Sequence, residues 1–198
     1  MFTLLLIVAN VAISLYALYQ DQSLLDRFML RPYREDRKRE YYTLITSAFL
    51  HADPAHLAFN MITLYFFGTA VERQVGPILF GVIYLLSVLS GSVVSQLKYK
   101  DDPNYATLGA SGGVSGVLFA AVLFFPGMSL YMFPIPFAIP GPIYAVLYIG
   151  YTYYASRSRN DGINHDAHLF GALAGLACAL WIAPESFSAF ISYFLKLL

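Results

Sequence analysis

The stretch Leu-Gly-Ala-Ser-Gly-Gly-Val-Ser-Gly at residues 108–116 places a serine among glycines, where a charged loop gives way to an apolar run. The loop, 98–104, carries four charges and a proline, and the run, 117–125, carries no charge. This pattern predicts a helix with Ser111 in its first turn, where unpaired backbone N–H groups and the helix dipole favour an anion. A serine nucleophile needs such a place, because its attack on a carbonyl group creates an oxyanion. The alternative is that the glycines only permit close helix packing.

The composition is that of a membrane protein. Of the 198 residues, 58% are apolar and 12% are charged, whereas about a quarter of an ordinary soluble domain is charged. Several apolar runs approach the ~20 residues that a membrane-spanning helix needs. We therefore predict an all-α, polytopic membrane protein in which residues 1–198 form a single domain. The formal net charge of zero gives no reason to expect nucleic acid as a partner, and a single cysteine, Cys178, excludes an intrachain disulfide.

Six apolar segments predict a bundle of six transmembrane helices, at about 1–18, 56–73, 78–97, 111–125, 142–154 and 165–182. The first segment lacks a basic leader and a clear cleavage site, so we interpret it as a spanning helix rather than as a signal peptide. The loop 20–50 mixes charged with apolar residues, which predicts an interfacial segment with a short amphipathic helix. A solvated loop is the alternative for its basic part. After the sixth segment we expect a further amphipathic piece.

Polar side chains are costly inside a membrane and usually face a cavity or a partner. His56 and Asn60 stand four residues apart, on one face of the second segment. His168 lies near the start of the sixth segment, and Ser111 opens the fourth. Because these three segments begin on the same side of the membrane, we expect the four residues at one level. The fourth segment would span only about 22 Å of about 30 Å of hydrocarbon, so we expect Ser111 below the membrane surface.

Two strips of small residues are expected to bring Ser111 and His168 together. Small side chains allow two helix backbones to approach closely within a membrane. One strip lies on the same helix face as Ser111, and the other lies on the same helix face as His168. Packing of the two strips would therefore bring the Ser111 hydroxyl toward the His168 imidazole. The strip beside His168 consists of Gly171, Ala172 and Gly175, and the strip beside Ser111 consists of Gly112, Ser115 and Gly116.

These polar residues supply a nucleophile and its base. Serine is a poor nucleophile until a base takes its proton, and His168 is the candidate base for Ser111. Asp166 lies two residues from His168, on roughly the opposite helix face, so we expect a dyad rather than a triad. His56, Asn60 and the backbone N–H of Ser111 are candidate donors to the oxyanion. For His56 the alternative is a helix-start histidine that binds loop carbonyls.

Two other chemistries are not favoured. The sequence has no H-E-x-x-H motif, and His165 with His168 forms only a weak metal pair, so we expect no metal and no cofactor. Residues 109–113 also satisfy G-x-S-x-G, the nucleophile elbow of the α/β-hydrolases. That elbow needs a preceding strand and a soluble sheet, and here a charged loop precedes it, so we reject that fold.

Three segments, in this order, resemble the rhomboid family of intramembrane serine proteases: HLAFN at 56–60, GASG at 109–112 and AHLFGALAG at 167–175. GTAVE at 68–72 also resembles the end of the family's second span, and the resemblance covers about residues 1–183, in the six-span bacterial form. It implies a serine endopeptidase of the cell membrane, without a cofactor, that cleaves transmembrane protein substrates near small residues at a site open to the outer side. The implied residues are the dyad Ser111 and His168, the oxyanion donors His56, Asn60 and the Ser111 N–H, and the supporting Gly109, Ala110, Gly112, Gly171 and Gly175.

Three features depart from the family pattern. The first loop has EYYT at 40–43 where many relatives carry Trp-Arg. Ser115 stands where relatives often have an aromatic residue under the histidine ring. Ten of the twelve Lys and Arg residues lie in loops that the family places outside, whereas the positive-inside rule predicts such loops on the cytoplasmic side. We follow the family for the orientation.

Two alternative functions remain open at this point. One is a catalytically silent rhomboid-like protein that binds membrane clients, although such proteins typically lack the dyad. The other, less favoured, is a small transporter or channel, which an internal repeat or an intramembrane acid–base chain would indicate. The sequence shows neither of these signs, and it does not specify an oligomeric state.

A buried serine must be reached from the lipid, so one helix is expected to move. The fifth segment is the candidate, because prolines loosen its start and bulky tyrosines pack it less closely than the small strips pack their helices. The alternative is that the tyrosines only anchor the membrane interface. The prolines are Pro134, Pro136, Pro140 and Pro142, and the tyrosines are Tyr144, Tyr148, Tyr151 and Tyr154.

Overall fold

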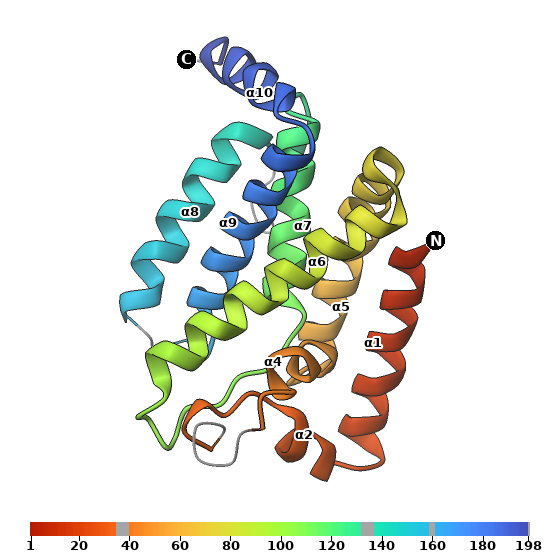
Figure 1. The fold of residues 1–198 in the computed structure, drawn as a ribbon, viewed down its shortest axis with the longest axis vertical. Helices are drawn as coiled ribbons and strands as arrows, with labels where there is room; N and C mark the ends of the chain where they lie inside the picture. Colours follow the sequence, from red (N-terminus) through yellow and green to blue (C-terminus); the bar gives the residue numbers. More distant parts are fainter. Residues whose placement is uncertain (35–39, 132–136, 159–160, 198) are drawn as a thin grey trace.

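The structure is a computed structural model that describes residues 1–34, 40–131, 137–158 and 161–197. It is a bundle of helices with one small hairpin, so the predicted all-α membrane class is confirmed (Figure 1). The hairpin pairs β1 (Ser129–Tyr131) with β2 (Ala138–Pro140) in antiparallel fashion. The helices are α1 (Phe2–Tyr19), α2 (Ser23–Phe28), α4 (Thr43–Thr46), the 3-10 turn η1 (Ser47–Phe49), α5 (Pro54–Thr63), the π-helical turn η2 (Leu64–Gly68), α6 (Thr69–Tyr99), α7 (Ser111–Phe124), α8 (Gly141–Ser158), α9 (His165–Ile182) and α10 (Glu185–Leu195).

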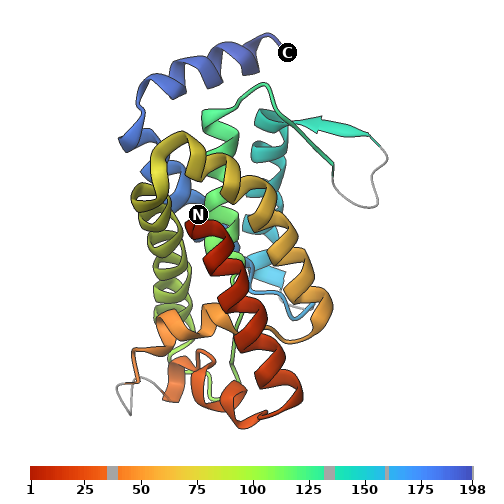
Figure 2. The ribbon, with the colours of Figure 1, turned by 90° about the vertical axis from the view of Figure 1, so that its right-hand side faces the viewer.

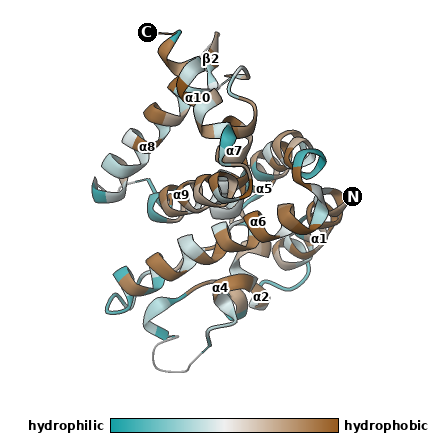
Figure 3. Ribbon diagram, turned by 45° about the horizontal axis from the view of Figure 1, so that its top comes forward, coloured by the Kyte–Doolittle hydropathy of each residue, from teal (hydrophilic) through white to brown (hydrophobic). Residues whose placement is uncertain are grey.

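Three helical segments of the described chain are long and apolar enough to cross a membrane: Phe2–Tyr19, Pro54–Tyr99 and His165–Ile182. Ser111–Phe124 is apolar but shorter, about 21 Å at 1.5 Å per residue. Hydrophobic residues cover much of α1, α5 and α6, while hydrophilic residues gather in the loops near α2 and at the end of α6 (Figure 3). The count of six spans stays a prediction.

The segment Pro54–Tyr99 is two helices in space. Gly76 has φ +82 and Pro77 follows it, so the helical path breaks there. Positive φ is costly for residues with a Cβ atom, which explains a glycine at the reversal. The chain turns back on itself at this point (Figures 1 and 2). The reversal lies between the predicted second segment, 56–73, and the predicted third segment, 78–97.

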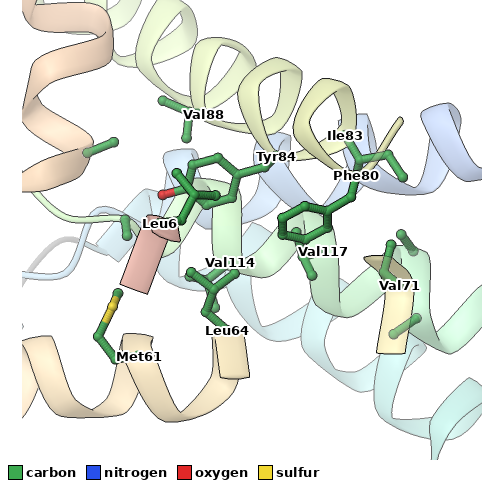
Figure 4. Close-up of a cluster of buried hydrophobic side chains, with 14 of the residues drawn as sticks. Leu6, Met61, Leu64, Val71, Phe80, Ile83, Tyr84, Val88, Val114 and Val117 are labelled. Carbon is green, nitrogen blue, oxygen red and sulfur yellow. The ribbon is translucent and has the colours of Figure 1, made fainter. Parts of the chain in front are cut away.

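Helix α7 is the centre of the bundle. Every residue from Gly112 to Leu123 is buried, and α5, α6, α8 and α9 all pack against it. Side chains from several elements meet around it, among them Phe80 beside Val117 and Leu64 beside Val114 (Figure 4). The helix begins inside the bundle, and the loop from α6 runs back to reach it (Figure 1). Ser111 is thus held within the bundle.

The two strips of small residues meet, as predicted from the sequence. A Cβ atom added at Gly171 would lie 2.2 Å from the carbonyl oxygen of Gly112, and one added at Gly175 would lie 2.0 Å from that of Gly116. Such distances are far below van der Waals contact, so only glycine fits at these two positions of α9. The close approach fixes the axial position of His168 relative to Ser111.

Some details differ from what the sequence predicts. The loop 20–50 contains α2, α4 and η1 rather than one short helix, and residues 35–39 of its basic part lie outside the described residues. Helix α8 begins at Gly141 and continues to Ser158, four residues past the expected end at 154. The β1–β2 hairpin was not predicted, and Pro134 and Pro136 lie outside the described residues.

Candidate active site

Ser111 is the first residue of α7, and the loop before it is pinned to the rest of the molecule. Thr107 exchanges two backbone hydrogen bonds of 2.9 Å with Leu30, and the N–H of Gly109 donates to the carbonyl of Ser47 at 2.9 Å. The backbone N–H of Ser111 has no partner within the helix, since the first turn of a helix lacks carbonyls to bind. A fixed loop therefore presents a helix N-terminus with a hydroxyl on it.

Gly109 allows His56 to lie against this loop. Gly109 has φ +128, and a Cβ atom there would lie 2.7 Å from His56 Cε1 and 3.8 Å from Ser111 Oγ. Both the backbone conformation and the close ring therefore require glycine. The imidazole of His56 is thus next to the serine, on the side where α5 begins.

The N-terminus of α5 sets the direction of His56 and Asn60. Asp53 caps the helix by accepting the N–H of His56 at 2.8 Å, with Pro54 in the first turn. One turn further, the amide of Asn60 donates to the carbonyl of His56 at 3.0 Å, which leaves its second N–H for another acceptor.

One cavity of about 710 Å³ joins the expected residues. It lies between α5 and α8, at the start of α7 and α9, and side chains from both loops and helices line it. The structure brings all four side chains expected at the site to this cavity. They are Ser111, His168, His56 and Asn60.

Asn164 fixes the start of α9, and with it His168. Its side-chain oxygen accepts the N–H of Ala167 at 3.0 Å, and its amide donates to Ser95 at 2.9 Å and to Thr107 at 3.2 Å. Ser95 belongs to α6 and Thr107 to the loop before Ser111, so one side chain ties three elements together. This cap was not predicted from the sequence.

Asp166 is directed away from the cavity. Both of its carboxylate oxygens accept from Lys98 Nζ at 2.9 Å, and Tyr99 donates its hydroxyl to the same carboxylate. The side chain is only 7% exposed. Its partners are all on α6, in keeping with the expectation that Asp166 does not bind His168.

His51 is a site residue that the sequence analysis missed. It is fully buried, and its ring packs edge-on against His56 with centroids 5.0 Å apart. Nδ1 binds Ser14 Oγ at 2.8 Å, and Nε2 accepts the N–H of Ala110 at 3.5 Å. Burial, followed by the adjacent His56, lowers the pKa of His51 to about 4, so the ring is neutral at neutral pH. His51 therefore supports both His56 and the residue before Ser111.

Tyr148 of α8 occupies the space beside Ser115. The two hydroxyls lie 2.8 Å apart, and the Tyr148 ring lies 5.3 Å from Phe119 of α7. Tyr148 also lines the cavity, whereas Tyr151 is 57% exposed. The aromatic side chain near this level of α7 thus comes from a neighbouring helix.

The site can support acyl transfer by a serine. It combines a hydroxyl at a helix N-terminus, an imidazole on a tightly packed neighbouring helix, and amide and imidazole donors on a third helix. Within the described part of the chain, no group of three or more His, Cys, Asp or Glu residues could hold a metal ion.

Comparison with known proteins identifies one family. The family model described as Rhomboid domain matches residues 38–185. The chain is 31% identical over 193 residues to "RHOMBOID-like protein 12, mitochondrial" of Arabidopsis thaliana, covering 89% of this chain and 56% of that protein. It is 32% identical over 151 residues to "Rhomboid protease GluP" of Bacillus subtilis, covering 76% of this chain and 28% of that protein. It is 31% identical over 139 residues to "Putative rhomboid protease YdcA" of Bacillus subtilis, covering 69% of this chain and 64% of that protein.

The chain spans about half or less of the length of the first two of these relatives. The matched region includes the loop before α5, the start of α7 and the start of α9, which all contribute to the lining of the cavity. Members of the matched family are usually intramembrane serine proteases. The chain belongs to the rhomboid family.

Proposed function

We propose that this chain is an intramembrane serine endopeptidase in which Ser111 is the nucleophile and His168 the base. The observation that carries the proposal is that Ser111, His168, His56 and Asn60 line the same cavity at the buried start of α7. The proposed substrates are transmembrane proteins cleaved near small residues, within one membrane domain of six spans.

The reaction proceeds in two halves. Ser111 Oγ attacks the carbonyl carbon of the scissile peptide bond while its proton passes to His168. The tetrahedral intermediate then expels the amine, which takes the proton from His168, and an ester with Ser111 remains. Water attacks the ester, giving a proton to His168. The ester bond breaks, the proton returns to Ser111 Oγ, and the new carboxyl end of the substrate leaves.

The oxyanion of each intermediate is stabilised by donors from two helices. The N–H of Ser111 comes from the first turn of α7, and His56 and the second amide N–H of Asn60 come from α5. These donors are held before substrate arrives by the Asp53 cap and by Gly109. Donors fixed in advance lose little free energy to reorganisation, and each contributes roughly 10²–10³ in rate.

The protein is embedded in a membrane, and we propose that its site opens to the extracytoplasmic side. The sequence favours the cell membrane through its bacterial resemblance. RHOMBOID-like protein 12 carries the word mitochondrial in its name, so an organelle membrane is a second candidate location. In both cases the polar loops at the start of α5, α7 and α9 supply water to the cavity.

The test is cleavage of a transmembrane substrate by purified protein in liposomes. Ser111→Ala and His168→Ala should each reduce cleavage about 10⁶-fold, since either change removes the nucleophile–base pair. Ser188→Ala, the same change on exposed α10, should leave cleavage unchanged. Asp166→Asn should change cleavage per folded molecule less than about threefold, because a triad aspartate is worth about 10⁴. Substantial cleavage by Ser111→Ala would refute the proposed nucleophile.

A further inference from the structure

A second imidazole, His165, lies one helical turn before His168 on α9. Its side chain is only 3% exposed, and its Nε2 binds Asp161 Oδ2 at 2.8 Å. The rings of His165 and His168 have centroids 6.1 Å apart at 79°, and Tyr151 of α8 packs edge-on against His165 at 5.5 Å. His165 therefore stands between a carboxylate and the proposed base.

The hydrogen bonds of this pair define its arrangement. Since a carboxylate only accepts, Nε2 of His165 carries the proton that binds Asp161. Nδ1 of His165 is buried and has no hydrogen-bond partner among the described residues. The bond from His165 lowers the pKa of Asp161, with the N–H of Ile163 adding to the effect, so Asp161 is ionised at neutral pH. Asp161 also lines the cavity that holds Ser111 and His168.

Other titratable groups near His168 belong to α5, α6 and α8, and His56 on α5 lines the same cavity. Asp166 is bound to Lys98 and Tyr99, on α6. Asp53 faces the cavity from the start of α5, on the side of His56. Tyr151 contacts His165 from α8. On the α9 side of the cavity, Asp161 is the carboxylate linked to the base through a ring contact.

We infer that the Asp161–His165 pair is a positioning unit that supplies the negative charge which stabilises protonated His168. The inference rests on the proposed function, because His168 becomes a cation only when it takes the proton of Ser111. A carboxylate nearby favours that cation, and a cationic His165 opposes it. Asp161 thus acts on the dyad through one intervening imidazole.

The experiment is a pH profile of kcat/KM for a transmembrane substrate in liposomes, from about pH 5 to 9. Asp161→Asn keeps a side chain of the same size and removes the charge. This substitution should lower the plateau value of kcat/KM roughly three- to tenfold. It should also move the acid limb to lower pH, because the base loses a group that favours its protonated form.

Two His165 variants distinguish the effect of the Asp161 charge from the effect of the His165 ring. His165→Gln retains an N–H that can hold Asp161, so it should keep the plateau within about twofold. His165→Leu cannot hold the carboxylate and should resemble Asp161→Asn. Asp101→Asn, which removes an exposed charge from the loop after α6, is the matched control and should match the wild type.

The outcomes are distinguishable from failure of the proposed function. A profile of Asp161→Asn that superimposes on the wild type overturns the inference, and so does a uniform drop without a shift of the acid limb, which indicates a structural role only. Ser111→Ala is run beside every variant. If the wild type does not cleave, or Ser111→Ala cleaves equally well, the proposed function fails and the inference fails with it.

Discussion

His51 joins parts of the chain that are far apart in the sequence. Ser14 donates its only proton to the carbonyl of Phe49 at 2.9 Å, so His51 Nδ1 must donate to Ser14. Nε2 is then the acceptor, in agreement with its contact to the N–H of Ala110. One neutral tautomer therefore satisfies all of these bonds and connects α1 with the residue before Ser111.

This arrangement predicts a pH-dependent stability. The pKa of His51 falls from 6.5 to about 4 on folding, so the unfolded chain binds more protons between these values. The free energy of unfolding should fall as the pH is lowered through this window, by about 3 kcal/mol from His51. Unfolding in detergent micelles, followed at pH 7 and pH 4, should show this loss in the wild type. His51→Asn should lose about 3 kcal/mol less, and parallel losses in the two proteins contradict the prediction.

The contrast between Ser111 and His51 shows what sequence patterns can reveal about a site. Ser111, His56 and His168 stand at starts of apolar segments, where a polar group is conspicuous and helix geometry places it. His51 lies in the polar loop before α5, and its partners are 37 and 59 residues away in the chain. No local spacing indicates such a contact. The aspartate bound to His165 was missed for a different reason, because the charged loop 157–161 resembles a solvated turn.

At the scale of helices, small and large side chains divide the bundle into a rigid and a looser part. α7 and α9 meet backbone to backbone at their glycines. α8 instead meets α7 through Tyr148 and Tyr144, whose rings stack on each other with centroids 5.6 Å apart. Gly150 of α8 has open space around it. A helix held by large side chains is easier to displace, in keeping with the expectation that the fifth segment moves.

The hydroxyl pair of Tyr148 and Ser115 should hold α8 closed. Its single hydrogen bond of 2.8 Å contributes about 1 kcal/mol to the closed position. Loss of this bond should therefore raise the ratio of open to closed α8 roughly fivefold. Tyr148→Phe keeps the ring, so it should raise cleavage of a transmembrane substrate about two- to fivefold and leave cleavage of a short soluble peptide unchanged. Tyr154→Phe, on the 72% exposed tyrosine of the same helix, is the control. Equal rates for Tyr148→Phe and wild type would show that this bond does not limit opening.

Some helix boundaries and short elements could not be predicted from the sequence, whereas others could. The predicted apolar runs match α1, α7 and α9 to within about two residues at each end. The far end of α8 was missed because residues 155–158, Ala-Ser-Arg-Ser, continue its helix beyond the apolar run. The hairpin and the π-helical turn η2 depend on tertiary contacts, which no local pattern reports.

At the scale of the whole molecule, most basic residues of the described chain lie at the end of the bundle where α5, α7 and α9 begin: Arg27, Arg31, Arg34, Lys98, Lys100 and Arg157. α10 lies across the other end (Figures 1 and 2). Several of these charges are paired within the fold: Arg31 and Arg34 bind Asp26 at 2.7 and 3.4 Å, and Arg34 binds Glu40 at 2.8 Å. Lys98 is bound to Asp166. A folded, internally neutralised loop presents less free positive charge than the sequence count indicates.

The orientation can be measured by labelling with a membrane-impermeant maleimide. In a Cys178→Ser background, Asp101→Cys marks the site end and Gln74→Cys marks the opposite end, and both positions are exposed. We expect Asp101→Cys to react in intact cells or spheroplasts and Gln74→Cys to react only after permeabilisation. The reason is that folded ion pairs neutralise much of the basic end, which weakens the positive-inside signal for that end. The reverse pattern of labelling would mean that the ten basic residues do determine the topology, with the cavity of Ser111 open to the cytoplasm.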